Sequence, residues 1–440
     1  MSTRPLAAAI AWIDPATLFA RGPARLPHAF WLDAGPDAAA GWSWLGAGTP
    51  VAEVPRDLVL DLRAEAPDTP GAFAGGHVGW FGYDAAAARA GAPTTADRTD
   101  GPQEAWLRVR RLVAFDHAAR RAWVIAETDD LDEAAAEVDA WRESPAYVPE
   151  YEPPAVPDAE ASARDSPAHY RELIERCRDA IRAGDAYQLC LTTRFAVTAS
   201  APLDPVAVYL RLRAELPAPR GGLIRVGEHA LLSASPERFL QVCGGFVRTR
   251  PIKGTRPRGA TPSEDDALAR ELHDSVKERA ENVMIVDLMR NDLQRICLPG
   301  SVSVERLLEV ESYSAVHQLV STVAGRLRPG TTFGRLLDAA LPAGSMTGAP
   351  KLSAMAILHG LESGARGVFA GCFGWLGDDG RADLAMIIRS IVVHPGGAYV
   401  GAGGGITYLS DADEEWAEVA LKVRGPLHAL GAALPAPWSD

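Results

Sequence analysis

Cysteine is scarce in this sequence. Its 440 residues include five cysteines, at positions 177, 190, 243, 297 and 372. Their number is odd and no two of them stand in a CxxC spacing, so the sequence predicts neither a disulfide framework nor a zinc site. A reducing compartment, the cytoplasm, is the expected location.

The sequence also lacks a basic excess and a long apolar run. Its formal net charge is −13, which leaves no footprint for nucleic acid or for an anionic membrane. The early apolar stretch over residues 6–13 ends at Asp14, far short of the roughly 20 residues of a spanning helix. We therefore expect neither nucleic acid nor membrane as a partner. An anionic substrate would have to meet a few local cations.

Lysine is rare as well. Only four of the 44 basic residues are lysines, namely Lys253, Lys277, Lys351 and Lys422. Where arginine is the default cation, a lysine indicates that a compact, deprotonatable amine was needed. All four fall between positions 253 and 422.

Composition divides the chain into three regions. Residues 1–145 alternate short apolar runs with Gly/Pro turns, residues 146–167 read as a linker, and residues 168–430 hold the motifs described below. Mixed runs of strands and helices favour an α+β fold with antiparallel sheets over a doubly wound fold. The expected elements include one helix over 263–293, single strands over 106–115, 239–249 and 384–394, and a strand over 398–401 that pairs with the last of these.

Two pairs of carboxylates have helical spacing. Glu278 and Glu281 form one pair, and Glu415 and Glu418 form the other. A spacing of i, i+3 places both side chains of a pair on one helix face, so two such helices could hold a magnesium ion with open positions. The spacing alone fits two solvated helix faces better.

The segment 250–259 places Lys253 among three arginines. Neighbouring positive charge lowers a lysine pKa and frees a nucleophilic amine, although a basic turn that binds a carboxylate is a compatible interpretation. Glu237 could act as a general acid if it is buried beside such a site, whereas alone it is more often a salt-bridged residue at a strand end.

Two glycine-rich segments resemble nucleotide-binding loops only superficially. Residues 344–351 lack the Gly-Lys-Ser/Thr ending of a phosphate loop, and residues 401–405 lack the spaced dinucleotide fingerprint. Both could instead offer backbone N–H groups to a carboxylate.

Taken together and in this order, the motifs resemble the chorismate-utilising enzymes. They are Ser-Pro-Glu-Arg-Phe (235–239), Pro-Ile-Lys-Gly-Thr (251–255), Glu-Asn-Val-Met-Ile-Val-Asp (281–287), Gly-Ala-Pro-Lys (348–351) and Gly-Ala-Gly-Gly-Gly-Ile (401–406). The resemblance runs from about Tyr170 to Lys422 and more loosely through the N-terminal region. It implies two packed antiparallel sheets flanked by helices, with an anthranilate-synthase-like region over 1–145 and a catalytic, chorismate-binding domain over 168–430.

The same resemblance implies a set of functional residues. Magnesium would be bound by Glu281 and Glu418, with Glu278 and Glu415 close by. Lys253 would attack C2 of chorismate while Glu237 protonates the departing C4 hydroxyl. The implied substrate-binding residues are Thr255, Ser345, Arg389, Gly403, Gly405 and Lys422.

Three positions discriminate between reactions in this family. Members that add water carry a lysine base where this chain has Gln188, and ammonia needs no such base. Lys253 resembles the aminodeoxychorismate synthases, whereas anthranilate synthases usually carry alanine there. Asn282 replaces the histidine that assists pyruvate elimination in anthranilate synthases. The resemblance thus implies amination to 4-amino-4-deoxychorismate with the enolpyruvyl group retained.

Partners and alternatives follow from what surrounds these motifs. No glutamine-amidotransferase motif is evident, so ammonia is expected from a separate amidotransferase subunit. Phe369 stands where relatives usually have a tyrosine, and Lys277 has no assigned role. The alternatives are an anthranilate synthase component, or a non-catalytic protein that binds chorismate or tryptophan, with residues 30–35 near where a tryptophan pocket would lie.

Overall fold

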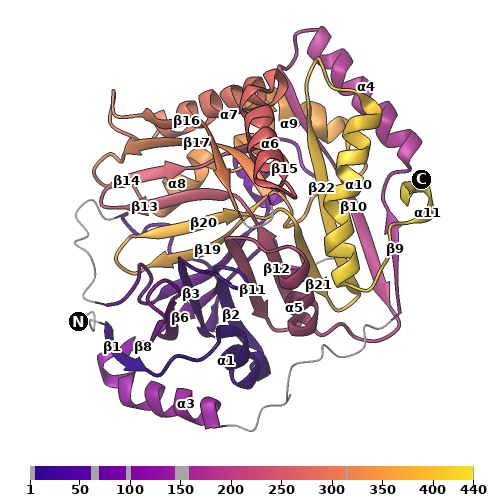
Figure 1. Ribbon diagram of the computed structural model, residues 1–440. Helices are drawn as coiled ribbons and strands as arrows, with labels where there is room; N and C mark the ends of the chain where they lie inside the picture. The colour runs from indigo at the N-terminus through magenta and orange to yellow at the C-terminus, as the bar shows by residue number, and fades with distance from the viewer. Residues whose placement is uncertain (1–4, 61–68, 96–100, 144–157, 314–315, 440) are drawn as a thin grey trace.

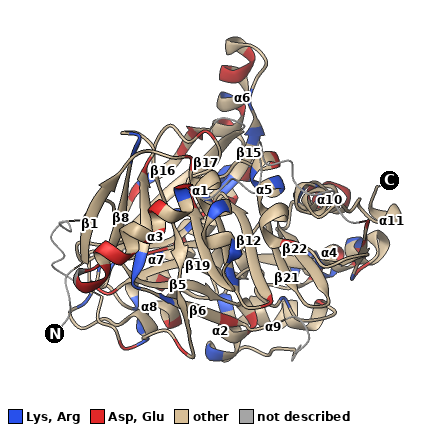
Figure 2. Ribbon diagram, turned by 90° about the horizontal axis from the view of Figure 1, so that it is seen from below, with Lys and Arg blue, Asp and Glu red and all other residues tan. Residues whose placement is uncertain are grey.

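The computed structural model describes residues 5–60, 69–95, 101–143, 158–313 and 316–439, which form two antiparallel sheets with helices around them (Figure 1). Every strand pairing in both sheets is antiparallel, which confirms the predicted fold class. Lysine and arginine lie scattered among aspartate and glutamate over many elements in Figure 2. Within the described ranges, no helix is long and apolar enough to cross a membrane.

The larger sheet, sheet A, has twelve strands and the smaller, sheet B, has ten. The order in sheet A is β1 (Pro5–Ile10), β8 (Arg121–Glu127), β7 (Arg111–Asp116), β3 (Trp42–Ala47), β2 (His28–Asp33), β11 (Arg220–Val226), β12 (His229–Ser235), β21 (Ser390–His394), β22 (Gly397–Ile406), β10 (Gln188–Ala199) and β18 (Gly348–Ala349), with β9 (Ala159–Ala163) also on β10. The order in sheet B is β15 (Ile252–Pro257), β17 (Val316–Arg326), β14 (Phe246–Thr249), β13 (Arg238–Cys243), β20 (Ala382–Met386), β19 (Cys372–Gly377), β5 (Gly76–Phe81), β6 (Glu104–Val109) and β4 (Thr49–Val51), with β16 (Ser303–Ser312) also on β17.

Strands from the first 145 residues lie inside both sheets. In sheet A, β2 pairs with β11, and in sheet B, β5 pairs with β19. The hydrogen-bonded ladders therefore join segments on both sides of the predicted linker. The division into regions stays a prediction, and most of the linker lies outside the described residues.

Helices cover the outer faces of the two sheets. Against sheet A lie α3 (Leu131–Glu143), α4 (Pro167–Arg182), α5 (Pro205–Glu215) and α10 (Ala412–Ala429), and against sheet B lie α6 (Pro262–Asp274) and α7 (Val276–Gln294). The remaining α-helices are α1 (Pro15–Arg21), α2 (Tyr83–Arg89), α8 (Phe333–Ala340), α9 (Lys351–Leu361) and α11 (Ala436–Ser439).

Side chains that alternate along the strands of sheet A pack into two hydrophobic cores, one on each face of the sheet. On β2, Phe30 packs into the core between the sheets, whereas Trp31 packs into the core beneath the helices. Ile224 and Leu223 on β11 divide in the same way. Successive side chains of a strand point to opposite faces, so a strand buried on both faces reads as a continuous apolar run.

Two expected elements are interrupted by single turns. The predicted helix over 263–293 is wrong as one element, because Ser275 adopts extended backbone between α6 and α7 and its hydroxyl accepts from the backbone N–H of Glu278. The predicted strand over 239–249 is a hairpin instead, because Gly244 and Gly245 both have positive φ, as a two-residue turn requires.

Two further expected strands change sheets part-way. The run over 106–115 leaves sheet B at the end of β6 and enters sheet A as β7. The run over 384–394 passes from β20 in sheet B to β21 in sheet A, and Arg389 lies in the crossover at a φ of 49°. The expected hairpin with the next strand is confirmed, since β21 pairs with β22 and His394 lies opposite Gly397.

Candidate functional site

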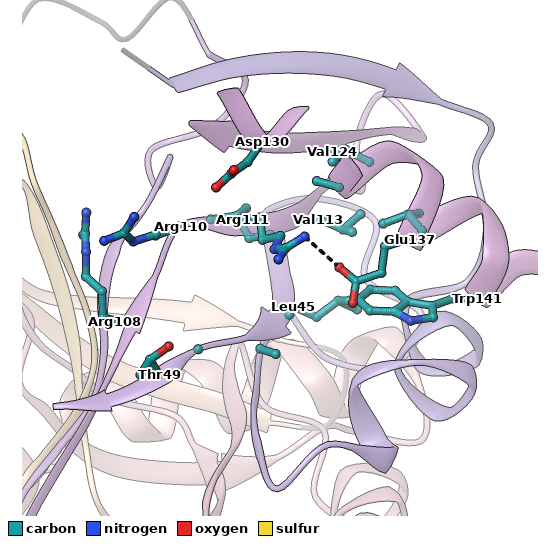
Figure 3. A pocket seen from close by; sticks show the side chains of 16 residues that line it. Leu45, Thr49, Arg108, Arg110, Arg111, Val113, Val124, Asp130, Glu137 and Trp141 are labelled. Atoms are coloured by element: carbon teal, nitrogen blue, oxygen red, sulfur yellow. Dashed lines mark ion pairs between the residues drawn. The ribbon is translucent and has the colours of Figure 1, made fainter. Parts of the chain in front are cut away.

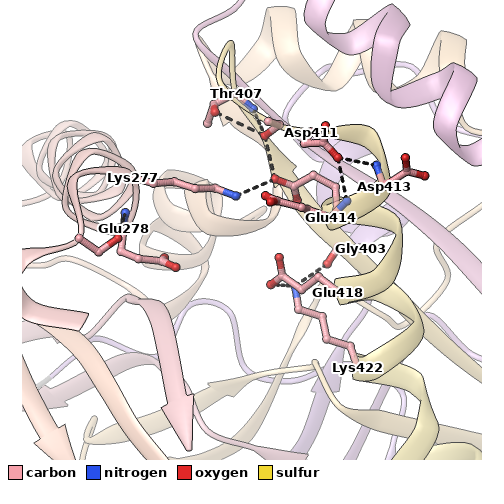
Figure 4. Close-up of polar contacts among 12 residues, drawn as sticks. Lys277, Glu278, Gly403, Thr407, Asp411, Asp413, Glu414, Glu418 and Lys422 are labelled. Carbon is pink, nitrogen blue, oxygen red and sulfur yellow. Dashed lines mark hydrogen bonds and ion pairs between the residues drawn. The ribbon is translucent and has the colours of Figure 1, made fainter. Parts of the chain in front are cut away.

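Two helices, α7 and α10, carry the four glutamates. Figure 4 shows Glu278 on α7 and Glu418 on α10. Glu281 and Glu415 are buried. Lys277 links the two helices, because its Nζ lies 3.2 Å from Glu415 Oε1. Ser410 also donates a hydrogen bond to the same carboxylate oxygen at 2.8 Å. Each pair thus has one buried member, Glu281 or Glu415, whereas the side chain of Glu418 is 50% exposed and that of Glu278 is partly buried.

Glycines allow the backbone to approach these carboxylates. A Cβ added at Gly404 on β22 would lie 2.9 Å from Glu415 Oε2, and one added at Gly254 on β15 would lie 3.0 Å from Glu278 Oε2. Gly254 also has a φ of +85°, which a residue with a side chain rarely adopts. The two strands therefore form the walls of the space into which the carboxylates point.

The donors suit a hard divalent cation. Burial raises the pKa of Glu281 to about 7; Glu278 and Glu415 act in the same direction, and Lys253 opposes them. Carboxylate oxygens from two helices are the ligands that magnesium or calcium prefers. In the part of the chain that the structure describes, no group of three or more His, Cys, Asp or Glu side chains converges so that it could hold a metal ion. An ion held by these glutamates would therefore need further ligands from water or substrate.

Lys253 on β15 lies among carboxylates rather than among arginines. Burial lowers the pKa of Lys253, but Glu281, Glu237 and Glu418 favour the ammonium form and the pKa is raised overall. The prediction that neighbouring arginines lower it is therefore wrong for the chain without bound ions. The arginines of that segment pair with acidic side chains: Arg250 with Glu311, Arg258 with Asp265, and Arg256 with Glu271 and also with Glu278 at 3.4 Å.

Glu237 lies between β12 and β13 with its side chain buried. Burial raises the pKa of this carboxyl to about 7, against the opposing effects of Lys253 and of the Ser345 hydroxyl. That hydroxyl donates to Glu237 Oε1 at 3.2 Å. Among the described residues Glu237 forms no ion pair, because the adjacent Arg238 pairs with Asp383 instead. A carboxyl with a pKa near neutrality can act as an acid at physiological pH.

The side chains of Gln188 and Lys253 both lie close to the backbone of Gly405. A Cβ added at Gly405 would lie 2.4 Å from Gln188 Nε2 and 3.5 Å from Lys253 Nζ. Gln188 is buried at the start of β10. The Gln188 amide and the Lys253 amine therefore both lie against the same stretch of β22.

The sequence-predicted substrate residues differ in the contacts that they make. Lys422 pairs with Glu418 at 2.9 Å and donates to the carbonyl of Gly403 at 2.8 Å. Burial lowers the pKa of Arg389, with Glu418 opposing, and no side-chain hydrogen bond or ion pair joins Arg389 to any described residue. A partly buried guanidinium with no partner among the described residues suits a bound anion. Thr255 lies two residues beyond Lys253 on β15, opposite Gln318.

Hydrogen bonds hold the Asn282 side chain in place, and packing holds the Phe369 ring. The Nδ2 group of Asn282 donates to the carbonyl of Leu319 at 3.1 Å, and its Oδ1 accepts from the Ser321 hydroxyl at 2.5 Å. Both ends of this buried amide are therefore occupied. Phe369 belongs to the core between the sheets and its ring lies against the backbone of Gly401.

Sequence reasoning missed the supports behind the site. Arg366 pairs with Glu362 at 2.6 Å and donates to the carbonyls of Met346 and Cys190. Lys351 at the start of α9 pairs with Asp292 on α7 at 2.6 Å. The rarity of lysine and the Gly-Ala-Pro-Lys motif single out Lys351 but not its partner Asp292, and nothing in the sequence marks Arg366.

Residues 38–428 match the sequence family described as chorismate binding enzymes. The chain belongs to the chorismate-binding enzyme family. The curated relatives within this family divide between two activities. An aminodeoxychorismate synthase of Streptomyces pristinaespiralis is 42% identical over 85% of this chain and 53% of its own length. Anthranilate synthase component 1 of Streptomyces coelicolor is 40% identical over 87% of this chain and 78% of its own length.

The relatives differ in how much of their own length this chain covers. The chain spans about half the length of the Streptomyces aminodeoxychorismate synthases that it matches. Among solved structures, anthranilate synthase component I from Streptococcus pneumoniae superposes with a TM-score of 0.75 at 30% identity, covering 97% of this chain and 92% of that one. The menaquinone-specific isochorismate synthase of Escherichia coli shares the fold at a TM-score of 0.72 and 18% identity, with 97% and 94% covered.

A small cavity of this chorismate-binding enzyme lies beside residues 30–35. The cavity next to Leu32 and Asp33 measures about 40 Å³, room for a few water molecules rather than an indole ring. Asp33 itself accepts from Arg213 at 2.5 Å. These contacts do not favour the interpretation of this segment as a tryptophan pocket.

Proposed function

We propose that the chain is the synthase component of an aminodeoxychorismate synthase, which aminates chorismate at C4 and leaves the enolpyruvyl group in place. The observation that carries the proposal is the position of Lys253, partly buried among carboxylates and near Gln188. Asn282 supports it, because a hydrogen-bonded amide cannot transfer the proton that pyruvate elimination needs.

Glu281, Glu418, Glu278 and Glu415 would hold a magnesium ion. Bound there, the ion would bind the ring carboxylate and supply positive charge that favours the neutral amine of Lys253. Arg389 and Lys422, aided by Ser345 and by the backbone at Gly403 and Gly405, would bind the remaining carboxylate. The closeness of Arg389 and Lys422 to Glu418 supports this placement.

The chemical steps are then assigned to two side chains. The neutral amine of Lys253 forms a bond to C2, the ring double bonds shift, and the C4–O bond breaks. Glu237 gives its proton to the departing hydroxyl, which leaves as water. Ammonia adds at C4, the double bonds shift back, and the C2–N bond breaks to release the neutral amine of Lys253. The Glu237 carboxylate takes back one proton from the nitrogen added at C4. The raised pKa of Glu237 supports its role, because it is largely protonated up to about pH 7.

Ammonia would come from a separate glutamine amidotransferase subunit. A relative from Klebsiella aerogenes is named aminodeoxychorismate synthase component 1, and it is 39% identical over 81% of this chain. A component name implies a second component in that protein. The same arrangement is our proposal for this chain.

The test is a product assay with chorismate, magnesium and ammonium at alkaline pH, followed by mass spectrometry. We expect a product in which one amine replaces one hydroxyl, with no release of pyruvate. Lys253→Met keeps the side-chain volume but removes the amine, and should lower turnover at least 1000-fold. Anthranilate and pyruvate, formed equally well by the variant, would identify the chain as an anthranilate synthase component instead.

A further inference from the structure

A pocket lies in the N-terminal part of the molecule (Figure 3). The four glutamates of α7 and α10 do not line it. It measures about 260 Å³ and lies between α3 and the adjoining face of sheet A. None of the residues assigned above to chorismate, magnesium or ammonia lines it.

The pocket forms where two strands change sheets together. In sheet A, β3 pairs with β7 as far as Leu45 and Val113. The chain next to each of them belongs to sheet B, where β4 pairs with β6 from Thr49 and Arg108 onward. Between these rungs, residues 46–48 face residues 109–112, so one strand has an extra residue. An extra residue on one side interrupts the ladder and bends the strand, as in a β-bulge. The interruption opens a space that the side chains of the sheet do not fill.

The floor and the mouth of this pocket differ in chemistry. Leu45, Val113 and Val124 of sheet A form an apolar floor, and the ring of Trp141 on α3 stands beside it (Figure 3). Val138 lines the pocket from α3 as well. Flat apolar walls beside an indole suit a planar ring. Ligand pockets for drug-sized molecules measure roughly 300–1,000 Å³. This smaller space therefore suits a molecule with one ring.

Three arginines stand at the mouth, and they are not equally engaged. Arg108 binds both oxygens of Asp378 at 2.7 Å, and Arg111 pairs with Glu133 and Glu137 on α3 at 3.2 and 3.4 Å. Arg110 is 63% exposed and lies 3.7 Å from Glu127, the loosest of these pairs. Arg110 is thus the guanidinium most available to a ligand anion.

Asp130 adds a requirement of its own. It also lines the mouth, and it forms no side-chain ion pair with any described residue. A ligand with an anion alone at Arg110 would be repelled by the Asp130 carboxylate. A ligand that also carries an N–H donor could bind both Arg110 and Asp130.

We propose that this pocket binds a single-ring aromatic carboxylate that carries an amino group. The ring lies over the apolar floor beside Trp141, the carboxylate pairs with Arg110, and the amine donates to Asp130. The inference does not depend on the reaction proposed above, because the pocket shares no residue with the catalytic cluster.

Calorimetry on the full chain tests the proposal, with 4-aminobenzoate as the probe. Benzoate lacks the donor for Asp130 and should bind at least threefold more weakly, and aniline lacks the anion and should not bind. Arg110→Glu should weaken 4-aminobenzoate binding at least tenfold. The matched control Arg121→Glu reverses the charge of an exposed arginine of β8 that does not line the pocket, and should change binding less than twofold.

Arg389→Ala distinguishes this pocket from the catalytic site, which also suits carboxylates. Binding that persists in Arg389→Ala and is lost in Arg110→Glu supports the proposal. Binding that is lost in Arg389→Ala and unaffected by Arg110→Glu places the probe in the catalytic site and overturns it. Absence of binding to the wild-type chain overturns it equally.

Discussion

Glu237 is the residue whose ionisation should be visible in the stability of the whole chain. Burial raises its pKa from 4.5 to about 7. Below pH 4.5 the carboxyl is protonated in both states and its stabilising effect is complete; as pH rises toward 7, the unfolded chain loses this proton first and the effect disappears. A difference of this size is worth about 3 kcal/mol. Urea unfolding without magnesium should therefore show wild type losing about that much more stability between pH 4.5 and 7 than Glu237→Gln. Parallel pH profiles would contradict the assignment.

Asn282 offers a second test at the residue scale. An imidazole in its place would lose hydrogen bonds to Leu319 and Ser321 inside a packed core. Asn282→His should therefore cost about 1–3 kcal/mol of unfolding free energy. We expect it to leave the nature of the product unchanged, because Lys253 and Gln188 remain. Release of pyruvate by this variant would show instead that position 282 alone selects the reaction.

Ser275 matters at the scale of the element, because it begins the helix that carries Glu278 and Glu281. Its hydroxyl caps α7 by accepting from the Glu278 N–H. Ser275→Ala should cost about 1 kcal/mol and raise the magnesium concentration needed for half-maximal turnover. Thr332→Ala is the matched control, since Thr332 caps α8 in the same way. The control should lose similar stability without the magnesium effect. Equal magnesium dependence in both variants would show that the cap does not orient the glutamates.

The elements also show where sequence reasoning succeeds and where it stops. The glutamate pairs could be predicted as neighbours because i, i+3 spacing is a local property of a helix. Fold class followed from the mixed order of strands and helices. The crossovers at Arg110 and Arg389 could not be predicted, because an apolar run has the same pattern in either sheet. The surroundings of Lys253 were misjudged for a related reason, since its sequence neighbours are arginines and its spatial neighbours are carboxylates.

At the scale of the whole molecule, the two sheets make the N-terminal and C-terminal parts interdependent. Without β2 and β5, strands β11 and β19 would each expose an unpaired edge. We expect residues 158–440 expressed alone to aggregate, and soluble material to appear when residues 1–143 are co-expressed. Solubility and near-ultraviolet circular dichroism would measure this. A soluble, cooperatively unfolding fragment would show that the catalytic region is an independent domain.

The pairing of β5 with β19 has a consequence for synthesis in the cell. Trp80 lies opposite Phe373, so an early strand cannot complete its ladder until nearly the whole chain has emerged. At about 5–20 residues per second, the wait between these two segments lasts on the order of 15–60 s. During that time the apolar edge of β5 is open to neighbouring nascent chains. Yield on overexpression should therefore respond to translation speed and to chaperone supply more strongly than the stability of the finished protein would suggest.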